Sequence, residues 1–164
     1  MKMIIRLLEN EDWKQFKTIR LEALLDCPEA FGSSFEEESN LSDEEFERNF
    51  KKSTIFGAYQ NNQLVGCAGF IICSLSKMSH RGVIFSMYIK NGYRAQGIGN
   101  SLLKAVIKHA KNLVIQLHLT VVTTNQTALK LYQNNGFRIY GTEPRALKIG
   151  DQFHDEHMMV LELS

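Results

Sequence analysis

The sequence predicts an α/β fold of the α+β kind, in which helices lie on the faces of one mixed sheet. Some segments alternate apolar and polar residues, whereas others repeat apolar residues at helical spacing. Two strand-like runs are joined by a short polar turn, as in a hairpin. Two helical segments each lie between strands, as in a crossover connection. The expected order is therefore β-α-α-β-β-β-α-β-α-β-β, with seven strands and four helices.

The first quarter of the chain predicts one strand followed by two helices. Residues 3–8 form a short apolar run typical of a strand, and apolar residues then recur at helical spacing over 10–28. A second, shorter helix is expected over 42–52, because a serine opens it and Glu45 occupies the capping-box position. The acidic stretch between the helices, residues 29–41, is expected to be a loop.

The middle of the chain predicts a hairpin, a further strand and a helix. Residues 54–59 and 63–75 are rich in strand-forming side chains and are joined by the polar tripeptide at 60–62. Residues 82–90 form another strand. The sequence becomes helical from Ala95 onward, with an apolar stripe on one face.

The last third predicts a strand, a helix and two closing strands. Residues 113–122 alternate apolar and more polar side chains. Asn125 can cap the helix that follows, and the Asn-Gly pair at 135–136 can end it. Residues 137–140 and 153–163 are expected to be the final strands.

The composition predicts one globular domain over residues 1–164. Hydrophobic residues make up 44% of the chain and charged residues 23%, which is too apolar for a disordered protein. The 19 Lys and Arg residues nearly balance the 18 Asp and Glu residues, so the formal net charge is +1. We therefore expect neither nucleic acid nor a membrane as a partner, because the chain has no overall field to attract them.

The cysteines and the N-terminus predict a cytoplasmic protein. Cys27, Cys67 and Cys73 are odd in number and have no C-x-x-C spacing, so they form neither a disulfide framework nor a zinc site. The N-terminal apolar run is too short for a secretory signal, and no run is long enough to cross a membrane.

A pair of glycines lies where a strand gives way to a helix. Gly97 and Gly99 free backbone N–H groups at the helix start, and Arg94 adds a cation beside them. This arrangement suits a diphosphate. Tight packing of the turn and the helix against the sheet explains the glycines equally well, so both interpretations stay open at this point.

Two nucleotide-binding motifs fit this turn poorly. A dinucleotide-binding fold needs a third glycine where this chain has Leu102, and its expected acidic residue about twenty positions later is missing. A P-loop needs a lysine directly after its second glycine, where this chain has Asn100.

Two motifs resemble the GCN5-related N-acetyltransferase (GNAT) superfamily. Residues 94–99, R-A-Q-G-I-G, are similar to the family's [Q/R]-x-x-G-x-[G/A] loop, and residues 87–93 look like its approach strand. Residues 125–137 match N-x-x-A-x-x-x-Y-x-x-x-G-F at every fixed position, and residues 20–32 resemble the family's substrate-side helix and loop. The resemblance implies a mixed, mostly antiparallel sheet of about seven strands flanked by four helices.

The resemblance implies acetyl-CoA as cosubstrate and no metal. The diphosphate would lie on the N–H groups of residues 96–100, and the pantetheine would pair with the main chain of residues 87–89 like an added strand. Asn125 is also explained as a helix cap, and Tyr132 by spacing alone as a core aromatic; the matched motif favours contact with the cofactor. The residues assigned to acetyl-CoA are Met87, Tyr88, Ile89, Arg94, Ala95, Gln96, Gly97, Ile98, Gly99, Asn100, Asn125, Ala128 and Tyr132.

Acyl transfer to an amine needs an acid, an oxyanion donor and a base. Tyr132 is the candidate acid, because a phenol and a thiol have reference pKa values of about 10 and about 8.5. The N–H of Met87 or a neighbour is the candidate oxyanion donor. The strand at 82–90 carries no carboxylate, so Glu36 and Glu37, with Glu38 beside them, are candidates for a base or for acceptor contacts. A solvated acidic loop is the alternative for these residues.

Residues 153–157, F-H-D-E-H, contain several side chains that can bind a metal ion. In a strand His154 and Glu156 face one way, whereas Asp155 and His157 face the other, so a common set of ligands is not expected.

The sequence therefore predicts an N-acetyltransferase that transfers acetyl from acetyl-CoA to a primary amine of a small molecule or peptide by direct attack in a ternary complex. A non-catalytic CoA-binding regulatory module on the same fold is the main alternative, and a nucleotide-binding protein is a third. Family habit allows a homodimer. The sequence does not identify the acceptor or the base.

Overall fold

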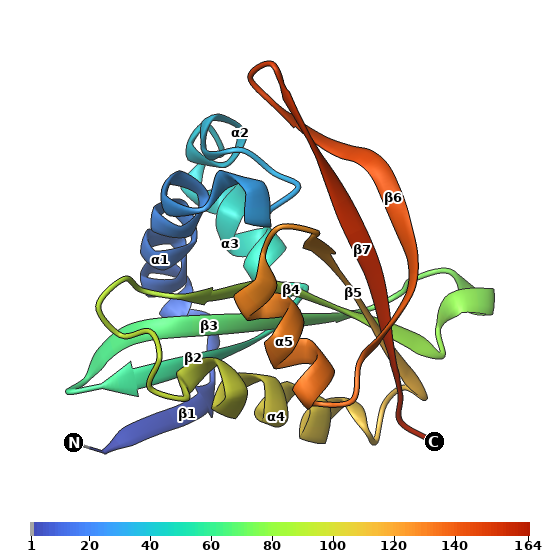
Figure 1. Cartoon of the computed structure of the whole chain (residues 1–164). Coiled ribbons are helices and arrows are strands. Elements are labelled where there is room, and N and C mark those ends of the chain that lie inside the picture. The colour runs from blue at the N-terminus through green and yellow to red at the C-terminus, as the bar shows by residue number, and fades with distance from the viewer. Residues whose placement is uncertain (1) are drawn as a thin grey trace.

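In the computed structural model, which describes residues 2–164, seven strands form one sheet in the order β1-β2-β3-β4-β5-β7-β6 (Figure 1). Neighbouring strands are antiparallel except β4 and β5, which are parallel. This confirms the mixed, mostly antiparallel sheet. The strands are β1 (Met3–Leu7), β2 (Thr54–Gln60), β3 (Gln63–Ile72), β4 (Arg81–Ile89), β5 (Gln116–Val122), β6 (Arg138–Ile149) and β7 (Gln152–Glu162).

Helices cover both faces of the sheet (Figure 1). The longer helices of each face bury an apolar stripe against the strands, giving one core under α1 and α3 and another under α4 and α5. None of the helices within residues 2–164 has the length and apolar character needed to cross a bilayer. The helices are α1 (Trp13–Asp26), α2 (Phe35–Ser39), α3 (Asp43–Lys51), α4 (Ile98–Ala110) and α5 (Gln126–Asn134).

Strands β4 and β5 stay together over only a short distance. They pair where Arg81–Val83 meets Gln116–His118, and then diverge while β5 continues along β7. Among the strands formed by residues 2–164, none pairs with this edge of β4 beyond Val83. Within residues 2–164, the second half of β4 therefore has no strand partner on that side.

A bulge bends β4 at the point of divergence. Cys67 of β3 faces Tyr88, but Gly69 faces Phe85, so two residues of β4 lie opposite one residue of β3. Ser86, one of the two, has a φ of 54°, a left-handed conformation that is uncommon outside glycine. The bulge re-aims the backbone of β4 where it approaches the candidate site.

Local sequence signals explain most element boundaries. Ser42 and Glu45 form the expected capping box of α3. Asn61 and Asn62 have φ values of 51° and 63°, as a two-residue hairpin turn requires, so the turn is one residue shorter than expected. The Asn125 side chain accepts a hydrogen bond from the Ala128 N–H and caps α5.

Two expectations about secondary structure were wrong. The acidic stretch at 29–41 is not entirely a loop, because Ser34 caps the five-residue helix α2. Strand β6 does not end at residue 140 but continues to Ile149, and irregularities in its pairing with β7 at Ile139/Gly141 and Glu143/Leu147 obscure the alternation of its side chains.

Candidate active site

A cavity of about 620 Å³ lies beside the free edge of β4. Its walls come from four segments: the turn after α1 within residues 27–31, the end of β4 at 87–89, the β4–α4 connection within 93–100, and the start of α5 within 124–131. Most of the residues that the resemblance assigns to acetyl-CoA line this one cavity. They are Met87, Tyr88, Ile89, Arg94, Ala95, Gly97, Ile98, Gly99, Asn100, Asn125 and Ala128.

Where the β4–α4 connection lines the cavity, several of its backbone N–H groups lack a partner within residues 2–164. Ala95 and Gly97 have φ values of 60° and 80°, and Gly97 is the N-cap of α4. The first N–H groups of a helix have no partner within it, and among residues 2–164 none accepts a hydrogen bond from those of residues 97–100. Unpaired N–H groups at the start of a helix of this length form a binding place for an anion.

The two glycines have different roles in this connection. A Cβ built on Gly97 would meet nothing within 4 Å, so the space beside it is open. A Cβ on Gly99 would lie 3.4 Å from Leu131 Cδ2, which is ordinary van der Waals contact, so packing of α4 against α5 does not require a glycine there. The Asn100 side chain accepts a hydrogen bond of 2.9 Å from Asn135 and joins the same two helices. The anion interpretation thus fits Gly97, and tight packing explains neither glycine.

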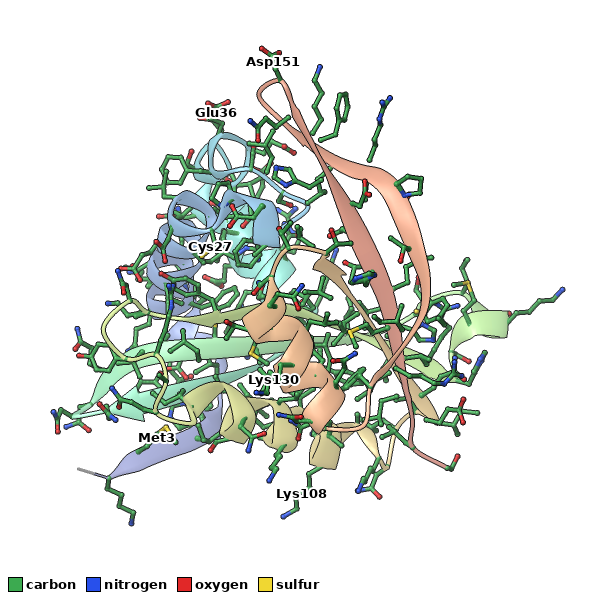
Figure 2. The ribbon with its side chains drawn as sticks, in the orientation of Figure 1. Met3, Cys27, Glu36, Lys108, Lys130 and Asp151 are labelled. Carbon is green, nitrogen blue, oxygen red and sulfur yellow. The ribbon has the colours of Figure 1, made fainter. Side chains whose placement is uncertain are left out.

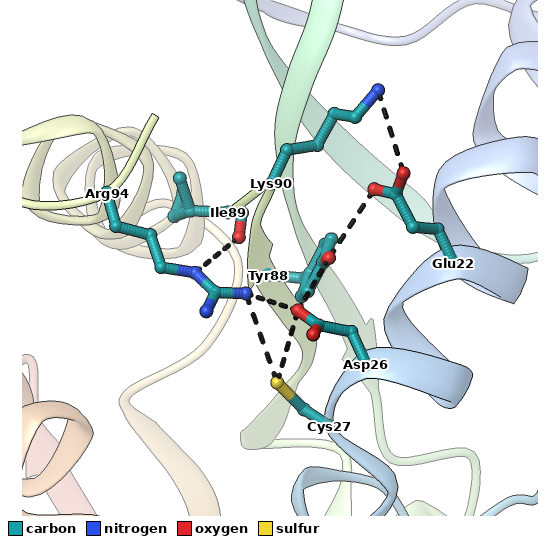
Figure 3. A network of polar contacts seen from close by, with 7 residues as sticks. All are labelled: Glu22, Asp26, Cys27, Tyr88, Ile89, Lys90 and Arg94. Carbon is teal, nitrogen blue, oxygen red and sulfur yellow. Dashed lines mark hydrogen bonds and ion pairs between the residues drawn. The ribbon is translucent and has the colours of Figure 1, made fainter. Parts of the chain in front are cut away.

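Arg94 connects the loop to β4 and to the end of α1 (Figure 3). Its Nε donates to the Ile89 carbonyl at 2.9 Å, and its Nη2 donates to Asp26 Oδ2 at 2.6 Å. Tyr88 donates its hydroxyl to the same carboxylate oxygen at 3.0 Å. These two hydrogen bonds hold the pKa of Asp26 below its usual range, and burial raises the pKa of Tyr88.

Arg94 keeps donor capacity for a ligand. Among residues 2–164, none accepts a hydrogen bond from its Nη1 group. The guanidinium also lies over the Tyr88 ring, 5.5 Å from the ring centre. The side chain is therefore fixed at the mouth of the cavity with part of its charge still available.

Tyr132 lies in the hydrophobic core. Its side chain is buried and packs edge-on against Phe137, with ring centres 5.9 Å apart. Burial raises the pKa of Tyr132 to about 12, and within residues 2–164 its hydroxyl has no hydrogen-bond partner. Tyr132 and Gln96 are the two assigned residues that do not line the cavity; the Gln96 side chain instead approaches Gln60 and the Gly92 carbonyl, each at 3.5 Å.

A second pocket, of about 310 Å³, lies between α1, α2 and α3 and reaches β4 at Phe85 and Ser86. Phe16, Phe46 and Phe50 form part of its wall. Glu37 lines this pocket. Glu36 does not, and Figure 2 shows it at the outer end of α2, pointing away from the sheet.

Glu38 also lines this pocket and is engaged in a partly buried ion pair. Both of its carboxylate oxygens accept hydrogen bonds from Arg20, at 2.9 Å and 2.7 Å. Arg20 also donates to the Ser86 hydroxyl at 2.7 Å. Of the three acidic side chains of α2, only Glu37 therefore combines exposure with contact to the pocket.

The polar side chains of β7 diverge as expected from a strand. Asp155 accepts a hydrogen bond from the Arg145 N–H at 2.8 Å, and His157 lies 2.9 Å from the Thr142 hydroxyl. Burial raises the pKa of Glu156. Within residues 2–164 no three His, Cys, Asp or Glu side chains are grouped so that they could hold a metal ion.

Several cavity residues were missed by the sequence analysis. Cys27 and Phe31 reach the cavity from the turn after α1, and Thr124 and Leu131 reach it from the α5 region. The last two lie inside or beside the 125–137 motif and could have been found there. The first two are brought to β4 only by the tertiary fold.

Comparison with protein families identifies the fold and the motifs together. The family model described as the acetyltransferase (GNAT) family matches residues 13–137. Human N-alpha-acetyltransferase 30 is 39% identical over 75 residues, which cover 43% of this chain and 21% of that protein. The chain thus matches only about a fifth of the length of this relative.

Solved structures share the fold over the whole chain. The acetyltransferase of the GNAT family from Streptococcus pneumoniae has a TM-score of 0.89 and 25% identity, covering 99% of this chain and 100% of that one. The protein yncA from Salmonella typhimurium, solved with its cofactor acetyl-CoA, has a TM-score of 0.85 and 19% identity, covering 100% and 95%. With the family model matching most of its length, the chain belongs to the acetyltransferase (GNAT) family.

Proposed function

We propose that the chain is an acetyl-CoA-dependent N-acetyltransferase that acetylates a primary amine of a small molecule or peptide by direct attack in a ternary complex. One observation carries the proposal: in a chain of this family, a single cavity joins unpaired N–H groups at the start of α4 to a free strand edge on β4. The unpaired N–H groups can bind the diphosphate of CoA. The strand edge can pair with the amide groups of its pantetheine arm.

The cofactor side of the proposed site uses mainly backbone. Residues 96–100 bind the diphosphate through their N–H groups, and Arg94 adds a cation at the entrance. The main chain of Met87, Tyr88 and Ile89 pairs with the pantetheine. Asn125 and Ala128 contact it from α5. The Arg94 bond to the Ile89 carbonyl must open if the pantetheine pairs with that carbonyl.

The proposed chemistry needs a donor for the oxyanion and an acid for the leaving thiolate. The Met87 N–H stabilises the developing charge on the thioester oxygen. Tyr132 donates its proton to the thiolate as the thioester breaks. A pKa of about 12 keeps Tyr132 protonated at neutral pH, and a thiolate formed in the same buried region is poorly solvated, so it accepts a proton more readily than in water.

The acceptor side of the proposal rests on the pocket between α1, α2 and α3. Glu37 lines it and is placed to attract a cationic amine or to take its proton. Glu36 is retained only as a longer-range contact, because its carboxylate lies away from the pocket. N-terminal α-amines are one acceptor class, supported by the name of the human relative.

A non-catalytic CoA-binding regulatory module is the second candidate function. The observation that favours it is the absence of any Asp or Glu from residues 81–89, because β4 then offers no base beside the acyl group.

Release of free CoA thiol from acetyl-CoA tests the proposal. The protein is assayed with pooled polyamines, amino acids, aminoglycosides and peptides, and an acetylated amine is sought by mass spectrometry. Amine-dependent release with an acetylated product supports the enzyme. Binding of acetyl-CoA without turnover of any pool supports the regulatory module, and absence of both contradicts both functions.

We also propose a cytoplasmic location, supported by the three free thiols of Cys27, Cys67 and Cys73. The proposal includes no nucleic acid or membrane partner and allows a homodimer.

A further inference from the structure

Arg20 lies where the two pockets meet. Its Nε and Nη2 groups donate to the two oxygens of Glu38, and its Nη1 group donates to the Ser86 hydroxyl at 2.7 Å. The guanidinium also lies over the Phe31 ring, 4.9 Å from its centre. Arg20 lines the smaller pocket and Phe31 lines the larger one. Arg20 thus bonds β4 between the two places where substrates are proposed to bind.

Ser86 occupies a backbone conformation that needs support. Its φ of 54° is unfavourable for a residue with a Cβ, and its side chain is only 5% exposed. Two contacts hold it in place. Arg20 binds its hydroxyl, and the Cys67 thiol donates to its carbonyl oxygen at 3.2 Å. The first contact comes from α1 and the second from β3, so the bulge is held from two separate elements.

The bulge determines the direction of the next N–H group. Phe85, before Ser86, lines the smaller pocket, and Met87, after it, lines the larger one. At the bulge, β4 has one more residue than β3 between the paired positions. If Ser86 returned to extended backbone, the peptide group that carries the Met87 N–H would change its orientation.

We propose that Arg20 is a positioning residue for acyl transfer: by holding Ser86 in its left-handed conformation, it aims the Met87 N–H at the thioester oxygen. This inference rests on the proposed function.

The surroundings of Arg20 hold its guanidinium in one position beside Ser86. Its side chain is 12% exposed and that of Glu38 is 15% exposed. Because Glu38 neutralises the guanidinium with two parallel hydrogen bonds, Arg20 is held in one orientation and its remaining donor points at Ser86. A lysine has a single donor centre and cannot hold both partners in the same geometry. Glu38 accordingly helps to orient Arg20, and both of its carboxylate oxygens are engaged in doing so.

The test compares kcat for Arg20→Gln, Arg20→Lys and Ser86→Ala with that of the wild type. In Arg20→Gln and in Ser86→Ala the oxyanion donor is expected to be misoriented, which should lower kcat by about 10- to 100-fold. The KM for acetyl-CoA should stay within about threefold of the wild-type value. Arg20→Lys is expected to fall between the wild type and Arg20→Gln. Lys17→Gln removes another ion-paired cation of α1, 2.8 Å from Asp43, and is the matched control with unchanged kcat.

The double variant separates positioning from general destabilisation. If Arg20 acts through Ser86, the double variant Arg20→Gln/Ser86→Ala should have the same kcat as the single variant with the lower kcat. Ser86→Gly is expected to keep more activity than Ser86→Ala, since glycine adopts positive φ without a Cβ. Multiplied effects in the double variant, or single variants with wild-type kcat, would overturn the inference. Ser86→Ala alone decides if Arg20→Gln does not fold.

A second readout does not depend on turnover. In ¹⁵N-labelled protein, acetyl-CoA is expected to shift the Met87 amide signal and those of residues 97–100. In Ser86→Ala the Met87 shift is expected to change while the shifts of 97–100 remain. Wild-type protein that neither binds nor turns over acetyl-CoA contradicts the proposed function itself, whereas an unchanged Met87 shift in the variant contradicts only the role of Arg20.

Discussion

Two pockets lie beside β4, one on the cofactor side of the proposed site and one on its acceptor side, and they are built from different groups. The cofactor side is formed largely by backbone: N–H groups at the start of α4 without a partner within residues 2–164, open space beside Gly97, and a strand edge with no strand partner in the same residues. The acceptor side is formed by side chains, with aromatic rings and the Arg20–Glu38 ion pair supplied by three helices.

This difference matches the two substrates proposed for the molecule. A diphosphate and a chain of amides are bound by peptide groups, which every sequence possesses, so few side chains are needed. An acceptor amine has to be distinguished from other amines by shape and charge, which only side chains provide. Substitutions on the first side should therefore change cofactor affinity, and those on the second side should change acceptor selection.

The largest expected effect is at Tyr132, in the core. Tyr132→Phe removes the proposed acid but keeps the buried ring, so kcat should fall by about 10²- to 10⁴-fold while acetyl-CoA affinity changes little. Steady-state kinetics and a binding titration measure the two quantities. Unchanged turnover would remove Tyr132 from the chemistry.

The pH profile gives a second test of the same residue. A group with a pKa of about 12 stays protonated until the pH approaches that value, so the acid form is not lost in the ordinary alkaline range. The kcat of the wild type should show no fall caused by Tyr132 between pH 7 and about pH 10. A fall in that range that disappears in Tyr132→Phe would contradict the raised pKa.

The next effect concerns the cofactor side alone. Gly97→Val places a side chain in the open space of the anion site, and acetyl-CoA affinity should fall by about tenfold or more, equivalent to about 1.4 kcal/mol. Gly150→Val is the matched control: Gly150 also has a positive φ and open space, but it lies in the β6–β7 turn. Isothermal titration calorimetry should separate the two variants, and equal affinities would contradict the placement of the diphosphate.

A smaller effect is expected at the mouth of the cavity. Arg94→Gln removes a cation but leaves the N–H groups of α4 in place, so acetyl-CoA should bind about 3- to 10-fold more weakly. The loss should shrink as the salt concentration rises, because screening weakens the contribution of a partly exposed charge. A loss that is the same at low and high salt would show that Arg94 acts through packing.

The smallest effect is expected on the acceptor side. Glu37→Gln should raise the KM for a cationic acceptor about two- to fivefold without changing acetyl-CoA affinity, because the carboxylate lines the pocket but is exposed to solvent. Glu36→Gln is the comparison from the same helix and should have a smaller effect than Glu37→Gln, because Glu36 does not line the pocket. A large fall in kcat in Glu37→Gln would instead identify this residue as the base.

The cofactor side could be predicted from the sequence because its signals are local. Gly97, Asn125 and the residues between β4 and α4 act through backbone conformation and helix capping, which depend on neighbours in the chain. The order of most elements along the chain was predictable for a similar reason, since apolar periodicity, turn residues and helix caps are also local signals.

The acceptor side could not be predicted in the same way. The Arg20–Ser86 contact joins residues 66 positions apart, and neither residue type alone indicates the other. Glu36, Glu37 and Glu38 are equivalent in sequence, but helix α2 turns the first outward, the second to the pocket and the third to Arg20. The bulge at Ser86 arises from strand pairing and has no mark in the sequence, because a serine does not favour positive φ.

Backbone hydrogen exchange with and without acetyl-CoA is the most direct test of this division. The N–H groups of residues 97–100 have no hydrogen-bond partner in the part of the chain that the structure describes, and they should exchange rapidly in the free protein. Acetyl-CoA should slow exchange at residues 97–100 and at 87–89, and leave the pocket around Glu37 and Asn49 unchanged. Slowed exchange confined to α2 and α3, or none at the start of α4, would contradict the account.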